Sequence, residues 1–330
     1  MAHVRTRIVS RAGVNLLATA CAKSAREAAG DGRFITFCDA AALPLARRIA
    51  REPGGAGATV IDVHGATLAI VDKLHAALKR RGATKKTVVV ACGAGALLDA
   101  VRLAAALYDG GARTLLIART LGAAIDRGVD PVARRGSSAV SAPPLGLIVD
   151  YAAIPRSAKD GLGTLVRDAF IEGDEFFDGL ETLSPHPLRK WPWESVIDDA
   201  LRVDRMHAGD ERQVLDLGLP FARAIAATRA VAAQTALALG IRAACLTARR
   251  VADFGERDHL RVLAVLALLG FSLHDERIDA DAVLDQIPAD TRFSLPHAIG
   301  DVEAGLAIPR VMLRRSIARL TSTPGAAEFR

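Results

Sequence analysis

The first half of the chain alternates short apolar runs with segments of helical spacing, and this alternation constrains the fold more than any other feature. The strand-like runs are residues 33–38, 59–63, 87–92, 114–118 and 145–149. Between them lie helical patterns, such as residues 67–81 and 97–108. Strands that alternate with helices form a mostly parallel sheet with helices on both faces. We therefore predict an α/β fold class, beginning with a Rossmann-like parallel-sheet domain.

From about residue 157 the pattern changes. Strand signals disappear, and successive segments place apolar residues at helical spacing. This pattern predicts an all-helical C-terminal domain. We predict a dinucleotide-binding-like α/β domain over residues 1–152 and a helical domain over 153–330. Residues 127–144 are rich in Gly, Ser, Pro and Arg, and predict a loop before the last strand of the first domain.

Composition and charge narrow the class of protein. The chain has 330 residues, of which 51% are apolar, enough for two domains with their own cores. The 43 basic residues are interleaved with 37 acidic ones, giving a net charge of +6, and we expect no nucleic-acid partner. No apolar stretch reaches the roughly 20 residues of a membrane span, and no signal peptide is evident, so we expect no membrane association.

The cysteines indicate the compartment. Cys21, Cys38, Cys92 and Cys245 are far apart and show no paired spacing. Such residues are typical of buried thiols in a reducing environment. We therefore expect a cytoplasmic protein.

Residues 88–99 read as a strand, a glycine turn and the start of a helix, with Gly93 and Gly95 in the turn. Glycine lets the backbone approach a phosphate closely, and a helix N-terminus offers unbonded N–H groups and a positive dipole. Many ordinary strand-to-helix turns carry the same two glycines. A nucleotide site and a plain turn therefore both stay open at this point.

Six segments, taken in order, resemble the motifs of a known family. They match, in sequence, GGGxxxD, PTTLLAxxD, GLAEVVKxxxI, EFF, RxxLNLGHTxxHAIE and RFVLPxxIG. The segments are residues 93–99 (GAGALLD), 118–126 (ARTLGAAID), 161–171 (GLGTLVRDAFI), 175–177 (EFF), 212–226 (RQVLDLGLPFARAIA) and 292–300 (RFSLPHAIG). The chain thus resembles the sugar-phosphate cyclases, with 3-dehydroquinate synthase as the type, within a superfamily that includes glycerol and iron-type alcohol dehydrogenases. The resemblance runs from about residue 30 to 305, and no single motif is intact, counting EFF as part of the helix motif that precedes it.

The resemblance implies a dinucleotide-binding domain, a helical domain, a cleft between them and a homodimer. It implies NAD as the cofactor, with contacts from Gly93, Gly95, Asp39 and Thr120. The family segment GExxK, which contacts the nucleotide, reads VHGA at residues 63–66. Whether this chain keeps NAD therefore stays open.

The same resemblance implies a change at the metal site. The family holds zinc with one Glu and two His, which here align with Thr164, Leu219 and Ala233. These three side chains do not form a zinc-ligand set. We therefore predict no zinc and no other metal.

The resemblance places Asp99, Asp126 and Arg212 at family positions that line the cleft. Asp99, Asp126 and His207 are the candidates for a catalytic acid or base. The candidates for binding a substrate anion are Arg212, Arg167, Arg202, Arg205, Arg119 and Arg223. Guanidinium groups suit phosphate and carboxylate, so these arginines imply an anionic small-molecule partner. An equally supported alternative is that they are solvated or pair with Asp99, Asp126 and Asp216.

Two functions follow from these positions. The first is a divergent dehydroquinate synthase homologue, zinc-independent and repurposed for an anionic small molecule in specialised biosynthesis, with altered lyase, cyclase or NAD-dependent chemistry. The alternative is a noncatalytic pseudoenzyme that acts as a partner or ligand-binding subunit. An authentic synthase is the least expected, because loss of the metal ligands removes most of the rate.

Overall fold

The structure is a computed structural model that describes residues 5–6, 14–64, 67–109, 111–127, 132–135, 138–207 and 209–324. It divides into two compact units, Met1–Ala158 and Lys159–Arg330. The dinucleotide-binding role of the first stays a prediction.

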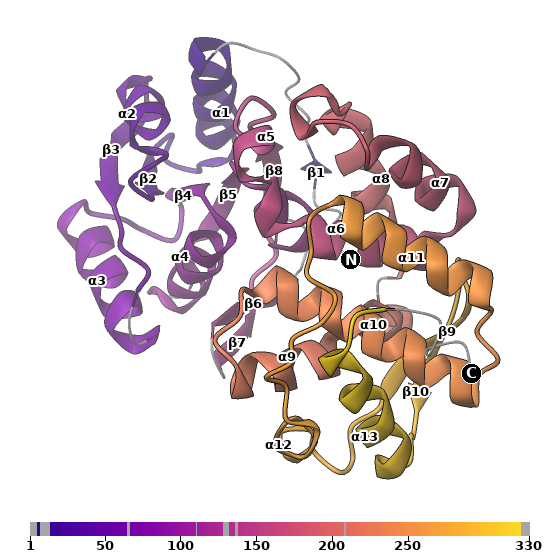
Figure 1. The fold of residues 1–330 in the computed structure, drawn as a ribbon. Coiled ribbons are helices and arrows are strands. Elements are labelled where there is room, and N and C mark those ends of the chain that lie inside the picture. The colour runs from indigo at the N-terminus through magenta and orange to yellow at the C-terminus, as the bar shows by residue number, and fades with distance from the viewer. Residues whose placement is uncertain are drawn as a thin grey trace. The chain divides into compact units, whose positions relative to one another are not determined.

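The first unit is built on a parallel sheet of six strands in the order β1-β8-β5-β4-β2-β3 (Figure 1). The strands are β1 (Arg5–Thr6), β2 (Phe34–Cys38), β3 (Gly55–Val60), β4 (Val88–Gly93), β5 (Arg113–Ala118) and β8 (Gly146–Val149). The central strands β2 and β4 are buried along their whole length, which explains why they read as continuous apolar runs. Strand β3 lies earlier than the predicted 59–63, because its glycine- and alanine-rich start carries no apolar signal.

Helices cover both faces of this sheet (Figure 1). They are α1 (Val14–Ala28), α2 (Leu43–Arg51), α3 (Thr67–Arg80) and α4 (Gly95–Leu107). Side chains of α1 and α2, among them Cys21, Leu45 and Ile49, form one core with Val90 of β4 and Ile117 of β5. Helices α3 and α4 lie on the other face. This arrangement buries both faces of the sheet, as a parallel sheet requires.

The predicted loop at 127–144 is wrong for part of its length. After a short π-helix, η1 (Ala123–Arg127), the structure has two antiparallel strands, β6 (Val132–Arg135) and β7 (Ser138–Ser141). The pair hydrogen-bonds to itself, separate from the main sheet. Its Gly, Ser and Arg content is typical of a loop, and the pairing of the two strands outweighs that local preference.

The second unit is mainly helical. Its helices are α6 (Leu162–Glu172), α7 (Asp174–Leu183), α8 (Trp193–Met206), α9 (Leu219–Thr228), α10 (Ala233–Val251), α11 (Glu256–Leu268), α12 (Ala280–Asp285) and α13 (Arg310–Ala318). Helix α10 is buried from Ala236 to Ala248 and forms the centre of the unit. A helix that is buried on all sides needs apolar residues all round, and α10 has them through most of its length.

The fold class is confirmed, with one correction to the all-helical second domain. Strands β9 (Phe293–Ala298) and β10 (Asp301–Leu306) form an antiparallel pair there. Gly300, between the strands, has a positive φ of 86°, which suits the tight connection. The strand signal was weak because Pro296 interrupts the apolar run, and proline usually argues against a strand.

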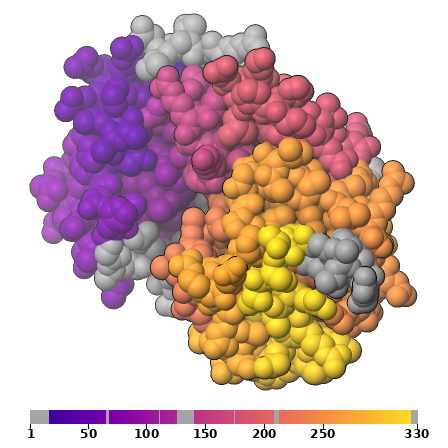
Figure 2. Space-filling model, viewed as in Figure 1, coloured from indigo at the N-terminus to yellow at the C-terminus, as the bar shows by residue number. Residues whose placement is uncertain are grey.

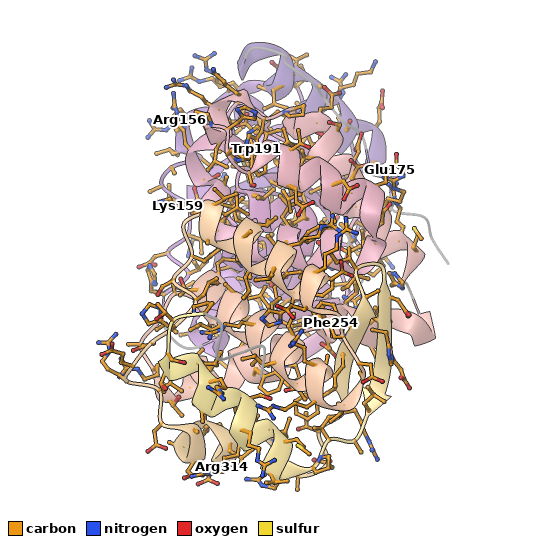
Figure 3. All side chains as sticks on the ribbon, turned by 45° about the vertical axis from the view of Figure 1, so that its right-hand side comes forward. Arg156, Lys159, Glu175, Trp191, Phe254 and Arg314 are labelled. Atoms are coloured by element: carbon orange, nitrogen blue, oxygen red, sulfur yellow. The ribbon has the colours of Figure 1, made fainter. Side chains whose placement is uncertain are left out.

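The interior of the second unit contains aromatic contacts, and its surface carries ion pairs. The ring of Phe254 packs against Phe170, at a centroid distance of 5.7 Å, whereas Arg314 projects from the surface of α13 and pairs with Asp281 of α12 (Figure 3). The space-filling view shows α11 to α13, in orange and yellow, packed on one face of this unit (Figure 2). No helix of the described part of the chain is long and apolar enough to cross a membrane.

Candidate functional site

In the first unit, polar groups gather at the carboxyl ends of the parallel strands. The strand order reverses between β2 and β4, and ligands of open parallel sheets bind at such a switch point. Asp39 follows β2, and the glycine turn with Gly93 follows β4. Arg119 and Thr120 follow β5, and Asp150 follows β8. The structure therefore brings the predicted cofactor residues and one predicted arginine to the same edge of the sheet.

The carboxylate of Asp39 occupies the glycine turn. Its Oδ2 accepts the backbone N–H of Ala94 at 2.9 Å, and its Oδ1 accepts the N–H of Ala42 at 2.8 Å. A Cβ added to Gly93 would lie 2.2 Å from Asp39 Oδ2, so only glycine leaves room for this carboxylate. Ala94 is the N-cap of α4 and has no capping side chain. The chain's own anion thus sits where the helix N-terminus attracts negative charge, next to the N–H groups that a diphosphate would use.

Arg119 bridges two of the neighbouring loops. Its Nε donates to Asp150 Oδ2 at 2.9 Å, and its Nη1 donates to the carbonyl oxygen of Ala41 at 2.6 Å. The hydroxyl of Thr120 accepts the N–H of Ala123, the first residue of η1. The Arg119 charge is therefore compensated by an acidic neighbour, in line with the alternative that these arginines pair with carboxylates.

Asp99 lies in the first half of α4, beside a buried arginine that the sequence analysis missed. Arg102 is fully buried and donates from Nε and Nη2 to the carbonyl oxygen of Ala142, and its Nη1 lies 3.7 Å from Asp99 Oδ1. A buried guanidinium needs a compensating charge, and Asp99 provides it. The sequence signal for this pair was a single Asp and a single Arg, three positions apart, in a helix whose other residues are apolar or glycine. Asp126 lies in η1, and its side chain is outside the described residues.

Three thiols lie beneath this edge, and all are protonated at neutral pH. Burial raises the pKa of Cys21 to about 12, helped by the negative charge of Asp150. Burial raises the pKa of Cys38 to about 11 and that of Cys92 well above its ordinary value. These three residues and Cys245 are free and buried. A protonated thiol is a poor nucleophile, so the cysteines act as core residues.

In the second unit, the positions aligned with the zinc ligands hold other chemistry. Thr164 is in the first turn of α6, Leu219 begins α9 and Ala233 begins α10. The side chain of Gln234 contacts Thr164 directly: Oε1 accepts the Thr164 N–H at 3.0 Å, and Nε2 donates to the Thr164 hydroxyl at 3.4 Å. Among the residues that the structure describes, no group of three His, Cys, Asp or Glu is arranged to hold a metal ion. The residues at this position do not fit zinc.

Two of the predicted anion-binding arginines bind carboxylates of the same unit. Arg167 donates from Nε and Nη2 to Asp168 Oδ1, at 2.9 and 2.6 Å, and both residues are buried. Arg202 of α8 pairs with Asp199 one turn earlier and lies 3.7 Å from Glu172 of α6. An arginine held by a carboxylate is less available to a ligand anion, because the carboxylate competes for the same donors.

The remaining candidates are spread over several elements. Arg223 is exposed, with its Nη2 3.9 Å from Asp216 Oδ1. Arg205 donates from Nε to a backbone carbonyl one turn earlier in α8, and His207 ends that helix. Arg212 is half-buried in the short helix η4 (Gly209–Asp216). The binding of a ligand by these residues stays a prediction.

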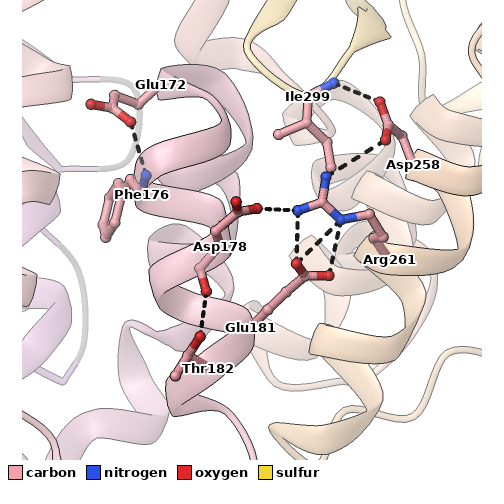
Figure 4. Close-up of polar contacts among 8 residues, drawn as sticks. All are labelled: Glu172, Phe176, Asp178, Glu181, Thr182, Asp258, Arg261 and Ile299. Carbon is pink, nitrogen blue, oxygen red and sulfur yellow. Dashed lines mark hydrogen bonds and ion pairs between the residues drawn. The ribbon is translucent and has the colours of Figure 1, made fainter.

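A polar cavity of about 580 Å³ lies between α7, α11 and the β9–β10 turn, and none of the residues aligned with the zinc ligands lines it. Its main cation is Arg261, which binds Asp178 and Glu181 of α7 and Asp258 of its own helix (Figure 4). Hydrogen bonds to Glu181 and Asp178, and the negative charges of these two carboxylates, raise the pKa of Arg261. The guanidinium also lies 5.2 Å from the centroid of the Phe177 ring. This network was missed because Arg261 and its partners on α7 are about eighty positions apart in sequence.

Comparison with known proteins agrees with this architecture. Residues 62–133 match the family model of the 3-dehydroquinate synthase N-terminal region. The chain is similar to 2-epi-5-epi-valiolone synthase from Streptomyces hygroscopicus subsp. jinggangensis 5008, a structure with NAD⁺ and Zn²⁺ bound. The identity is 21%, the TM-score is 0.80, and the match covers 97% of this chain and 98% of that one.

Two further structures extend the comparison. A 2-deoxy-scyllo-inosose synthase complexed with carbaglucose-6-phosphate, NAD⁺ and Co²⁺ is 16% identical, with a TM-score of 0.78 over 95% of this chain and 96% of that one. A probable glycerol dehydrogenase from Sinorhizobium meliloti 1021 is 13% identical, with a TM-score of 0.65 over 97% of this chain and 98% of that one. At these identities the likeness concerns the fold.

The fold is therefore the one shared by sugar-phosphate cyclases and glycerol dehydrogenases. Within this fold, residues 62–133 are dehydroquinate synthase-like, as the motifs in that stretch predicted.

Proposed function

We propose that this dehydroquinate synthase-like chain does not carry out metal-dependent cyclisation and acts as a noncatalytic ligand-binding or partner subunit. The observation that carries the proposal is the Thr164–Gln234 hydrogen-bonded pair at the aligned metal position. Without a metal, the chain lacks the Lewis acid that polarises a ketone in this chemistry. Within each unit, predicted anion-binding arginines are compensated by neighbouring carboxylates, Asp150 in the first and Asp168 and Asp216 in the second, which also supports the proposal.

A second candidate function is a zinc-independent enzyme for an anionic small molecule. It is favoured by the charge of the first unit, which has 22 basic and 11 acidic residues, a formal net charge of +11. A surplus of this size attracts anions such as NAD or a sugar phosphate. In this candidate, Asp99 or Asp126 would supply the catalytic carboxylate.

Elemental analysis of the purified full chain, combined with calorimetric titration of NAD and an assay of phosphate release from a panel of sugar phosphates, tests both candidates. We expect less than stoichiometric zinc and no phosphate release above the blank. Phosphate release that persists in EDTA would establish the second candidate in place of the first. Stoichiometric zinc would contradict both, because it would mean that Thr164, Leu219 and Ala233 are not the metal positions.

A further inference from the structure

Helix α6 has no N-terminal cap of its own. Its N-cap residue, Gly161, has no side chain to accept the unbonded N–H groups of the first turn. The N–H of Thr164, the third residue of the helix, instead donates to Gln234 Oε1 at 3.0 Å. Gln234 lies seventy positions later, in the first turn of α10. A side chain from another helix therefore caps α6.

The packing around Gln234 agrees with this role. Gly163 precedes Thr164, and a Cβ added to it would lie 2.9 Å from Gln234 Oε1 and 3.0 Å from the Gln234 carbonyl oxygen. The glycine thus leaves the space that the amide fills. Gln234 Nε2 also reaches the Thr164 hydroxyl, so both ends of the amide group are directed at the same residue.

The position of the Thr164–Gln234 contact and the charge at the start of α6 relate it to the aligned metal site. Thr164 on α6 and Ala233 on α10 align with two zinc ligands, so a bound metal would link the same two helices. We infer that Gln234 replaces this link and connects α6 to α10 without a metal. A neutral amide oxygen satisfies the positive end of α6, whereas a divalent cation beside an uncapped helix N-terminus is unfavourable. The inference rests on the proposed function in one respect, the absence of a metal at this position.

Hydrogen exchange measured by mass spectrometry on the full chain in EDTA tests this link between α6 and α10, called the tie below. The variants are Gln234→Ala, Gln234→Glu and the control Thr235→Ala, which alters the next side chain on α10. We expect the amides of residues 162–165 to exchange about five- to tenfold faster in Gln234→Ala, because an N-cap contributes roughly 1 kcal/mol. Gln234→Glu should keep the protection, since a carboxylate also accepts the Thr164 N–H and suits the helix dipole.

The outcomes separate the inference from the proposed function. If the wild-type chain is free of zinc and Gln234→Ala exchanges like Thr235→Ala, the tie is wrong and the proposed function stands. If the wild-type chain contains zinc and EDTA removes the protection of residues 162–165, both are wrong. Should Gln234→Ala fail to fold, Gln234→Met keeps the side-chain volume without the amide, and the same exchange difference is expected from it.

Discussion

The surroundings of single residues in this protein determine their protonation and charge. His259 of α11 illustrates the point for a neutral side chain. It is fully buried, and burial, followed by the nearby charges of Arg249 and Arg242, lowers its pKa to about 4 from an ordinary value of 6.5. The folded state therefore keeps this imidazole neutral over a range in which the unfolded chain is protonated.

We expect the free energy of unfolding to fall as the pH is lowered from about 6.5 to 4, because the unfolded state then binds more protons than the folded state. The stability that depends on a neutral His259 is fully present above pH 6.5. The loss of free energy of unfolding reaches ~3 kcal/mol across the window down to pH 4. Urea denaturation at a series of pH values gives the free energy of unfolding as a function of pH. The slope of this dependence should be smaller for His259→Gln than for wild type. His186→Gln, at an exposed position, should leave the slope unchanged. Equal slopes for wild type and His259→Gln would contradict the assignment.

Asp39 illustrates the point for a charged side chain. We expect Asp39→Ala to lower the free energy of unfolding by ~1–2 kcal/mol, because the variant loses acceptors for the N–H groups of Ala42 and Ala94 at the starts of two helices. Chemical denaturation is the measurement. Asp72→Ala, at an exposed position of α3, is the matched control and should have little effect. A similar loss in the two variants would mean that Asp39 does not act as a cap.

At the scale of elements, close approach between backbones sets which helices can pack together. Helices α9 and α10 meet at Gly218 and Gly240, and a Cβ added to Gly240 would lie 2.3 Å from the Gly218 carbonyl oxygen. Because that oxygen is backbone, it cannot rotate away as a flexible side chain would. Gly218 itself has a φ of 75°, which also favours glycine.

We expect Gly240→Ala to lower the free energy of unfolding by ~3 kcal/mol through this overlap. Gly179→Ala is the matched control, because Gly179 lies inside α7 and an added Cβ would meet nothing within 4 Å. It should raise the stability by about 1 kcal/mol, the helix-propensity gain of alanine over glycine. Thermal denaturation of both variants makes the comparison. A stable Gly240→Ala variant would mean that α9 can shift away from α10.

At the scale of the whole molecule, charge is divided unequally between the two units. The net charge of +6 is the sum of +11 on residues 1–158 and −5 on residues 159–330. The unit that contains the glycine turn is thus strongly basic, and binding of any anionic ligand there should weaken as ionic strength rises. The resemblance to dehydroquinate synthases also implies a homodimer, which we retain as a proposal.

Light scattering after size-exclusion chromatography tests the assembly. We expect a mass of about twice the 34.7 kDa of the chain, because soluble oligomers of this kind are most often twofold dimers. A tenfold dilution series shows whether the dimer dissociates. A mass near 34.7 kDa at all concentrations would exclude the dimer.

Much of the fold could be predicted from the sequence, because strands such as β4 and helices such as α3 carry their signal locally. The failures were also local in origin. Pro296 obscured β9, and the Gly and Ser content of residues 132–141 obscured the β6–β7 pair. At the site, residue type alone predicted that Leu219 and Ala233 do not supply zinc ligands, since ligand chemistry belongs to the side chain and not to its surroundings.

The sequence by itself thus determined the order of the strands and helices, the family resemblance and the chemical nature of the groups at the aligned metal position. Only the tertiary structure decided how those groups are used: that Asp39 caps the glycine turn, that Asp99 compensates Arg102, and that Gln234 caps α6. The physical reason is the distance along the sequence over which each property is set. Periodicity and ligand type are properties of neighbouring or single residues, whereas a hydrogen bond or ion pair depends on which distant segments the packing brings within about 3 Å.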